Sequence, residues 1–189
     1  MAAGFSPSAL DLHLDAPFDE AATALARGLA EPAHIVGNSM GGQLAIHLAA
    51  LRPDLVLSLT LVSSTGLPFH LRRHVRNTLT LTGLASMALM VRRDLFRNSP
   101  FAIVRGLRRL MRDDVRPLLR QLRVPMLLLW GDRDPLVPLV YANEVFAEVP
   151  HAELVVIPRA GHMPMWENAP AFNDALVAFL RKTDGKVAR

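Results

Sequence analysis

Short runs of almost uninterrupted apolar residues alternate along the chain with segments in which apolar residues recur at the spacing of a helix. The apolar runs occupy residues 33–39, 56–64, 124–132 and 152–162. The segments with helical spacing occupy residues 19–30, 41–52, 141–150 and 169–182. Because buried strands without polar alternation are typical of parallel sheets covered on both faces, we predict an α/β fold with a mostly parallel sheet covered by helices.

Candidate catalytic residues stand at or just beyond the ends of three of these predicted strands. Ser39 closes the first run, Asp132 and Asp134 come at the end of the third, and His162 closes the fourth. In open parallel sheets, ligands bind at the carboxyl ends of the strands, so we expect these side chains to lie near one another. A serine, an acid and a histidine are the groups that nucleophilic catalysis by a hydroxyl requires.

Residues 37–41, GNSMG, have the form G-x-S-x-G at the junction of a predicted strand and a predicted helix. Glycine weakens both elements, but a sharp turn at this place holds a serine in a strained conformation with its hydroxyl projecting. We expect a Cβ at Gly37 or Gly41 to collide across the turn, and Gly42 to let the helix approach the sheet. The amide of Met40, at the helix N-terminus, is then placed to stabilise an oxyanion. The alternative is a glycine-rich turn with an idle serine.

Three stretches resemble the α/β-hydrolase superfamily: HIVGNSMGGQLAIHLAALRPDLVLSLTLVSS, VPMLLLWGDRDPLVP and LVVIPRAGHMPMWENAPAFNDALVAFL. Together the resemblance covers about residues 20–68 and 124–180. Within the superfamily, the sequences of these stretches are similar to those of esterases and of the carbon–carbon bond hydrolases that cleave aromatic ring-fission products. The GNSMGG segment in particular is similar to the carbon–carbon bond hydrolases. The resemblance implies a serine-dependent hydrolase that cleaves an ester or a C–C bond of a small apolar substrate and needs no cofactor.

The resemblance also implies a role for each residue of a Ser-His-Asp triad. Ser39 would be the nucleophile, His162 the general base, and Asp134 the acid that orients the histidine. Asp132 is the alternative acid, although we interpret it as a turn residue. For His162, the alternative is a strand-end residue that faces water.

Residues next to the histidine receive structural roles. We expect Glu167 and Asn168 to cap the last helix, and Trp166 to pack against the protein. The other histidines are interpreted as surface or core residues. No set of histidine and acidic residues has the spacing of metal ligands, so we predict no metal site.

The resemblance divides the chain into a core and an inserted cap. Residues 1–68 and 124–189 would form the α/β-hydrolase core, and residues 69–123 a small helical cap with turns near Gly83, residues 98–100 and Pro117. The apolar residues of this cap are candidates to line a pocket for an acyl or aromatic group.

The start of the chain departs from the pattern of the superfamily. Only 36 residues precede Gly37, and the GFSPSA segment resembles a loop that follows the fourth strand, so the first strands are expected to be missing. The alternative is that residues 9–15, ALDLHLD, form a remnant strand. In the superfamily, the loop after the third strand carries a His-Gly-type motif that supplies a second oxyanion donor, and we find no counterpart of it in this sequence. The strand at residues 34–39 would then be an exposed edge that can pair with another copy, and the alternative function is a catalytically impaired short form that binds ligands or self-associates.

Basic residues gather in the middle of the chain. Residues 69–123 contain 13 arginines and three aspartates, which suggests nucleic acid, anionic lipid, an anionic substrate, or a solvated helical face. No aromatic residues interleave with these arginines and no helix-turn-helix or zinc-finger spacing occurs. We therefore favour the solvated face and predict no nucleic-acid partner.

The amino-acid composition and the apolar runs indicate the cellular compartment of the protein. The chain has no cysteine, which favours a reducing compartment, and its first residues lack the basic leader and apolar core of a signal peptide. The longest mostly apolar run, residues 78–91, is 14 residues long and too short to span a bilayer. These features predict a cytoplasmic protein that does not insert in membranes.

Overall fold

A single parallel sheet forms the centre of the computed structural model, which describes residues 4–9, 16–68, 105, 108, 110 and 112–187. Its strands are β1 (Ala33–Asn38), β2 (Val56–Val62), β3 (Met126–Gly131) and β4 (Glu153–Ile157). They are ordered β1-β2-β3-β4, and every neighbouring pair is parallel. The predicted α/β fold is therefore confirmed.

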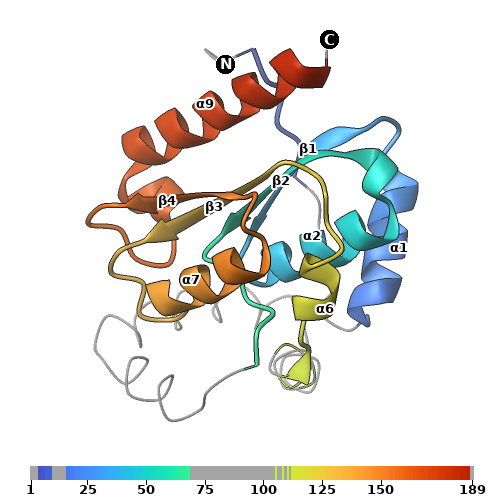
Figure 1. The fold of residues 1–189 in the computed structure, drawn as a ribbon, viewed down its shortest axis with the longest axis horizontal. Helices are drawn as coiled ribbons and strands as arrows, with labels where there is room; N and C mark the ends of the chain where they lie inside the picture. The colour runs from blue at the N-terminus through green and yellow to red at the C-terminus, as the bar shows by residue number, and fades with distance from the viewer. Residues whose placement is uncertain are drawn as a thin grey trace.

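Helices cover both faces of this sheet. They are α1 (Phe18–Gly28), α2 (Met40–Leu51), η1 (Pro53–Leu55), α6 (Arg116–Leu119), α7 (Leu139–Glu148), α8 (Pro164–Glu167) and α9 (Ala169–Val187). Helix α9 lies on one side of the sheet, whereas α1, α2, α6 and α7 lie on the other (Figure 1). The carboxyl ends of the strands are thereby left as the place where loops from different strands meet.

The central strand β3 lacks polar alternation because both of its faces are buried. Successive side chains of a strand point to opposite faces of the sheet. Leu128 and Trp130 accordingly belong to the core beneath α2 and α7, whereas Leu127 and Leu129 belong to the core beneath α9. Each such leucine is fully buried, and burial of a leucine side chain stabilises a fold by roughly 1.5–3 kcal/mol.

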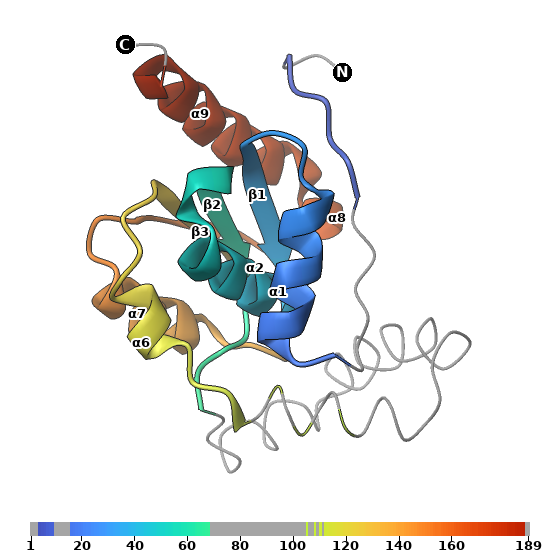
Figure 2. The ribbon, with the colours of Figure 1, turned by 90° about the vertical axis from the view of Figure 1, so that its right-hand side faces the viewer.

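Strand β1 lies at the edge of the sheet among the residues that the structure describes, as predicted for residues 34–39. The segment of residues 4–9 passes on this side of the molecule (Figure 2). There the Phe5 ring meets the His34 ring edge-on, with centroids 5.9 Å apart. The alternative strand at residues 9–15 lies almost wholly outside the described residues, so it is not tested. Pairing of this edge with a second copy stays a prediction.

Some predicted boundaries are corrected by the structure. The fourth predicted strand ends at Ile157, and residues 158–162 form a loop. The turn predicted at Pro117 is instead the first turn of α6, where a proline is tolerated because its missing N–H has no intrahelical acceptor. Most of the predicted cap, including Gly83 and residues 98–100, lies outside the described residues.

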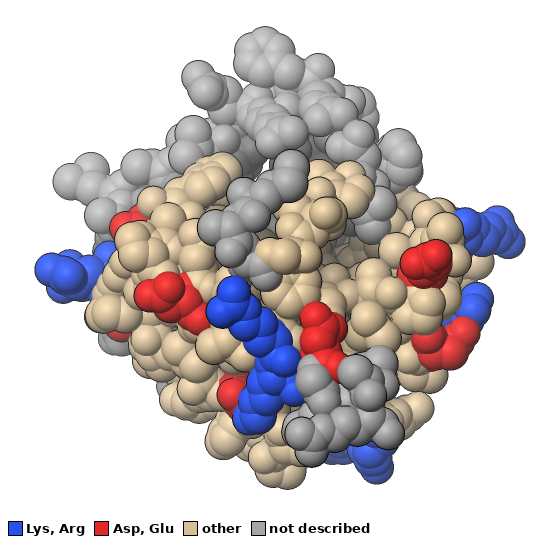
Figure 3. All heavy atoms as spheres, turned by 90° about the horizontal axis from the view of Figure 1, so that it is seen from above, with Lys and Arg blue, Asp and Glu red and all other residues tan. Residues whose placement is uncertain are grey.

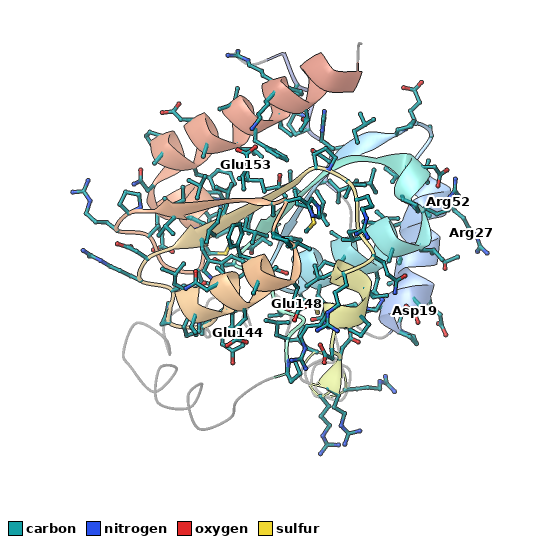
Figure 4. The ribbon with its side chains drawn as sticks, in the orientation of Figure 1. Asp19, Arg27, Arg52, Glu144, Glu148 and Glu153 are labelled. Atoms are coloured by element: carbon teal, nitrogen blue, oxygen red, sulfur yellow. The ribbon has the colours of Figure 1, made fainter. Side chains whose placement is uncertain are left out.

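Several charged side chains on the described surface pair with opposite charges. The Arg120 guanidinium donates to Glu148 at 2.6 Å, and the Lys182 ammonium donates to Glu153 at 2.6 Å. Figure 4 shows Glu148 beside α6 and Glu153 on the side of the sheet that faces α9. On the face shown in Figure 3, basic and acidic side chains are interspersed. No helix in the described part of the chain has the length and apolar character needed to cross a bilayer.

Candidate active site

Ser39 occupies a sharp turn between β1 and α2. Its backbone adopts φ 53° and ψ −120°, a sparsely populated conformation that costs about 1–3 kcal/mol. The turn is fixed from both directions, because the Ser39 amide donates to the Val62 carbonyl at 2.9 Å and the Ser39 carbonyl accepts from Thr65 at 3.2 Å. The strained strand-turn-helix geometry predicted for this serine is present.

The residues around Ser39 explain why the turn can be so tight. A Cβ on Gly37 would lie 2.5 Å from the Gly41 carbonyl oxygen, so the predicted collision across the turn is confirmed for Gly37. Met40 is the first residue of α2. Its N–H therefore lacks an intrahelical acceptor, and it lies at the positive end of the helix dipole.

Asp134 follows β3 and is held by three hydrogen bonds. Its Oδ1 accepts from the amides of Leu136 at 2.8 Å and Val137 at 2.9 Å. Its Oδ2 bonds to His162 Nδ1 at 2.9 Å, and its side chain is 0% exposed. The two amides fix the plane of the carboxylate, so the second oxygen is aimed at the imidazole.

His162 lies in the loop after β4 with its ring almost completely buried, the side chain being 2% exposed. A carboxylate can only accept hydrogen bonds, so His162 Nδ1 carries the proton toward Asp134 and Nε2 is left with its lone pair. Nε2 is buried and has no partner among the described residues. A buried, unpartnered acceptor is costly and calls for a functional explanation. The alternative of a histidine facing water is wrong.

Asn38 links the serine turn to the histidine loop. Its Nδ2 donates to the Val62 carbonyl at 3.1 Å and to the His162 carbonyl at 3.4 Å. Because Asn38 directly precedes Ser39, these bonds bring the loop of His162 to the turn of the serine. Asn38 was not predicted from the sequence, where its only signal is a polar side chain at the end of a strand.

Close backbone contact joins the loops of Asp134 and His162. A Cβ on Gly131, the last residue of β3, would lie 2.3 Å from the Ala160 carbonyl oxygen. Asp132 accepts a hydrogen bond from the Ala160 amide at 3.2 Å, so it holds the loop and is the turn residue that was expected. The structure thus places Asp134, and not Asp132, against the imidazole.

The structure corrects the predicted roles of Glu167 and Trp166. Glu167 accepts hydrogen bonds from the amides of Gly161 at 2.7 Å and Met163 at 3.0 Å, so its side chain holds the histidine loop instead of capping α9. Asn168 does stand at the N-cap position of α9, where its backbone carbonyl accepts from the Phe172 amide at 3.0 Å, but its side chain holds the loop by donating to the Pro158 carbonyl at 3.0 Å. The one-turn helix α8 separates this loop from α9 and places the Glu167 carboxylate over the loop amides. Trp166 is 69% exposed, so it does not pack into the core.

This fold recurs in known proteins. A profile described as the alpha/beta hydrolase family matches residues 2–175. The chain belongs to the alpha/beta hydrolase family. A crystal structure of an alpha/beta hydrolase enzyme from the metagenome of lagoon sediments at Mar Chica, Morocco, superposes with a TM-score of 0.71 at 22% identity, covering 92% of this chain and 77% of that one.

Curated relatives of this alpha/beta hydrolase carry different names. The dihydrolipoyllysine-residue acetyltransferase component of an acetoin cleaving system from Pseudomonas putida is 35% identical, over 79% of this chain and 46% of the relative. A pimeloyl-(acyl-carrier protein) methyl ester esterase from Neisseria meningitidis is 31% identical, over 87% and 65%. A 2-hydroxy-6-oxononadienedioate/2-hydroxy-6-oxononatrienedioate hydrolase from Paraburkholderia phymatum is 29% identical, over 79% and 62%. The chain spans less than two thirds of the length of each of these relatives.

This alpha/beta hydrolase contains a second set of serine, histidine and aspartate side chains, which differs from the set at Ser39 in the burial of its serine and in its position within a strand. His34 Nδ1 bonds to Ser58 Oγ at 2.7 Å, and His34 Nε2 bonds to Asp184 at 2.8 Å. Ser58 is 0% exposed, lies within β2 in register with His34 of β1, and begins no helix. The set joins α9 to the sheet, so it serves as a structural comparison for the site at Ser39.

His47, on the buried face of α2, lies between two carboxylates. Its Nδ1 bonds to Asp19 of α1 at 2.8 Å and its Nε2 bonds to Asp113 at 2.8 Å. Gln43 also donates to Asp113 at 2.7 Å and accepts from Thr65 at 2.9 Å. Since both ring nitrogens face acceptors, both donate, and the ring is an imidazolium. This network ties α1 and the chain that returns at Asp113 to the helix that begins at the serine turn.

The charges of this network predict a pH-dependent contribution to stability. Burial lowers the pKa of His47, but hydrogen bonds and charge from Asp113 and Asp19 outweigh burial, so the pKa of His47 is raised above 6.5. The stabilisation is then complete below pH 6.5 and is lost as the pH rises through the raised pKa. We expect the difference in unfolding free energy between the parent and His47→Gln to shrink between pH 6 and pH 9, by about 1 kcal/mol or less because Asp19 is exposed to solvent.

Denaturant unfolding of both proteins across this pH range measures that difference. His151→Gln is the matched control, because His151 is exposed on the surface and its replacement is expected to leave the unfolding free energy unchanged at every pH. A parent-to-His47→Gln difference that stays constant or grows toward pH 9 would contradict the charged state of His47.

Metal ligands do not gather at this site among the described residues. No group of three or more histidine, cysteine, aspartate or glutamate side chains in that part of the chain is arranged to hold an ion. The chemistry that these residues offer is that of the serine hydroxyl, the imidazole and the backbone amide.

Proposed function

We propose that this alpha/beta hydrolase is a serine-dependent hydrolase that uses Ser39, His162 and Asp134 as its catalytic triad. The observation that carries the proposal is the buried, unpartnered His162 Nε2, whose ring is oriented by the 2.9 Å bond to Asp134. The strained turn of Ser39 and the bridge through Asn38 support it. The names of the curated relatives, two of which are an esterase and a hydrolase, support the same class of reaction.

The proposed reaction on an ester proceeds by two transfers of the acyl group. His162 Nε2 takes the proton of Ser39 Oγ as this oxygen attacks the carbonyl carbon, and the Met40 amide donates to the oxyanion that forms. The C–O bond to the leaving group breaks, the leaving alcohol takes the proton from His162, and the acyl group stays on Ser39. Water, deprotonated by His162, then releases the acid and restores the serine. Asp134 holds the imidazole and stabilises its positive charge throughout.

A small apolar ester, or a small apolar compound cleaved at a C–C bond, is the proposed substrate class. The reasons are the leucines, methionines and phenylalanines of residues 69–123 and the names of the relatives, one of which is a methyl ester esterase and another a 2-hydroxy-6-oxononadienedioate/2-hydroxy-6-oxononatrienedioate hydrolase. We propose no cofactor, and we propose the cytoplasm as its location.

Covalent labelling tests the triad without knowledge of the substrate. A fluorophosphonate is expected to add once to the native protein, and peptide mapping by mass spectrometry is expected to place the adduct on Ser39. Heat-unfolded protein is the control and should stay unlabelled, because the reactivity depends on His162. A native, folded protein without an adduct, or an adduct on another residue, would refute the proposed mechanism.

A catalytically impaired protein that binds ligands or self-associates is the second candidate function. It is favoured by the edge position of β1 among the described strands. Edge strands pair with other strands, so this candidate predicts a homo-oligomer. Light scattering on the unlabelled protein distinguishes the two, since a monodisperse monomer would contradict assembly through the edge.

A further inference from the structure

The carboxylate of Glu167 brackets His162 in the chain. One oxygen, Oε2, accepts from the amide of Gly161 at 2.7 Å, and the other, Oε1, accepts from the amide of Met163 at 3.0 Å. These are the residues directly before and directly after the histidine. A single side chain therefore fixes the backbone on both sides of the proposed base.

The loop that carries His162 depends on this attachment. Arg159 has φ 58° although it is not glycine, a strained conformation that persists only where the surroundings fix it. Hydrogen bonds to an ionised carboxylate are roughly twice as strong as those between neutral groups, and Glu167 makes two of them. Asn168, Asp132 and Asn38 hold other points of the loop with single contacts.

The Glu167 carboxylate packs closely against the backbone of the loop. A Cβ on Gly161 would lie 3.0 Å from Oε2 and 3.2 Å from Oε1 of Glu167, so the absence of a side chain at Gly161 permits the carboxylate to reach both amides. Because α8 ends at Glu167, one helical turn separates the histidine from the group that fixes it.

We propose that Glu167 is a positioning residue that sets His162 for proton transfer by holding the two flanking amides. The inference rests on the proposed function of His162 as general base. A displacement of about 1 Å at a catalytic group costs on the order of 10²-fold in rate. Loosening the loop should therefore slow the step in which His162 takes the serine proton and leave the binding of the probe unchanged.

Glu167→Gln separates this role from a general loss of stability. The amide has nearly the shape of the carboxylate, but its NH₂ group faces one of the two backbone N–H groups and cannot accept from it. Glu153→Gln is the matched control. The Glu153 carboxylate also accepts a hydrogen bond from another segment of the chain, from Lys182 on α9, but it lies outside the site. Glu167→Asp, which keeps the charge and shortens the reach, is the second variant.

The experiment measures fluorophosphonate inactivation, melting temperature and amide exchange of the four proteins. For Glu167→Gln we expect kinact to fall by about 10- to 100-fold with Ki unchanged, and the amides of Gly161 and Met163 to exchange faster than in Glu153→Gln. We expect Glu167→Asp to be intermediate, and the two glutamine variants to melt within a few degrees of each other. If Glu167→Gln does not fold, the comparison is made on Glu167→Asp with the same criteria.

Each outcome bears on a different statement. A folded Glu167 variant that is inactivated at the rate of the parent overturns the inference and leaves the proposed function standing. A kinact that falls only in proportion to the unfolded fraction also overturns it. If the parent and Glu153→Gln are not labelled while both are folded, the proposed function fails, and the positioning role fails with it.

Discussion

Ser39→Ala is expected to abolish the hydrolysis of 4-nitrophenyl acetate, with kcat falling by roughly 10⁶-fold where the triad works as a unit. The hydroxyl is the only group of the protein that bonds to the acyl carbon in the proposed mechanism, and its removal breaks no backbone hydrogen bond of the turn. The folded structure should therefore persist. Initial rates at saturating substrate, together with the mass of the protein after fluorophosphonate treatment, measure the loss.

Ser58→Ala is the matched control for this result. Ser58 has a hydrogen bond to a histidine, His34, whose other nitrogen bonds to a carboxylate, but Ser58 is fully buried within a strand. Its replacement should cost about 1 kcal/mol of stability for the lost hydrogen bond and leave the rate and the adduct unchanged. Equal rates in the parent and in Ser39→Ala would show that the activity does not pass through Ser39.

The positions of the proposed triad residues could be predicted because they depend on few features of the sequence. The apolar runs at residues 33–39, 124–132 and 152–162 are long enough to contain strands, and parallel strands present their carboxyl ends at one edge. Gly37 allowed the turn to be predicted, because only a glycine at this position leaves room for the Gly41 carbonyl. The strand ends therefore sufficed to bring Ser39, the two aspartates and His162 to one edge of the sheet, whereas the preference for Asp134 over Asp132 came from the resemblance to the α/β-hydrolase superfamily.

The contacts that support these residues could not be predicted in the same way. Glu167 stands just before an apolar helix, where an acidic residue ordinarily caps the helix, yet the loop amides of residues 161 and 163 lie closer to it. The choice between two sets of amides depends on the fold of the loop in three dimensions. No periodicity in the sequence records that choice.

The network around His47 shows the same limit over a longer distance. His47 meets Asp113 across 66 residues of chain, and most of the intervening segment belongs to the predicted cap. The position at which the chain returns to the core after this segment decides which carboxylate contacts the His47 ring. A histidine on the apolar face of a helix gives no sign of two acidic partners, so the sequence analysis left it as an ordinary core or surface residue.

Asp134→Asn is expected to lower kcat by roughly 10⁴-fold, as the loss of the orienting acid does in a serine triad. Asparagine Oδ1 can still accept from the amides of Leu136 and Val137, so the loop should keep its shape. The Nδ2 group then faces His162 Nδ1 and donates to it. This forces the proton of the imidazole onto Nε2, which can no longer take the proton of Ser39. Steady-state kinetics with 4-nitrophenyl acetate measure the loss.

Asp132→Asn provides the control that decides which carboxylate is the acid of the triad. Asp132 accepts a single bond from the Ala160 amide at 3.2 Å, and asparagine Oδ1 can accept the same bond, so we expect kcat to stay within a few-fold of the parent. Wild-type turnover in Asp134→Asn would contradict the orienting role of the 2.9 Å contact. A loss as large in Asp132→Asn as in Asp134→Asn would mean that the loop, and not the tautomer of His162, governs the rate. The two substitutions change one atom each, two residues apart, so their difference isolates the proton on the imidazole.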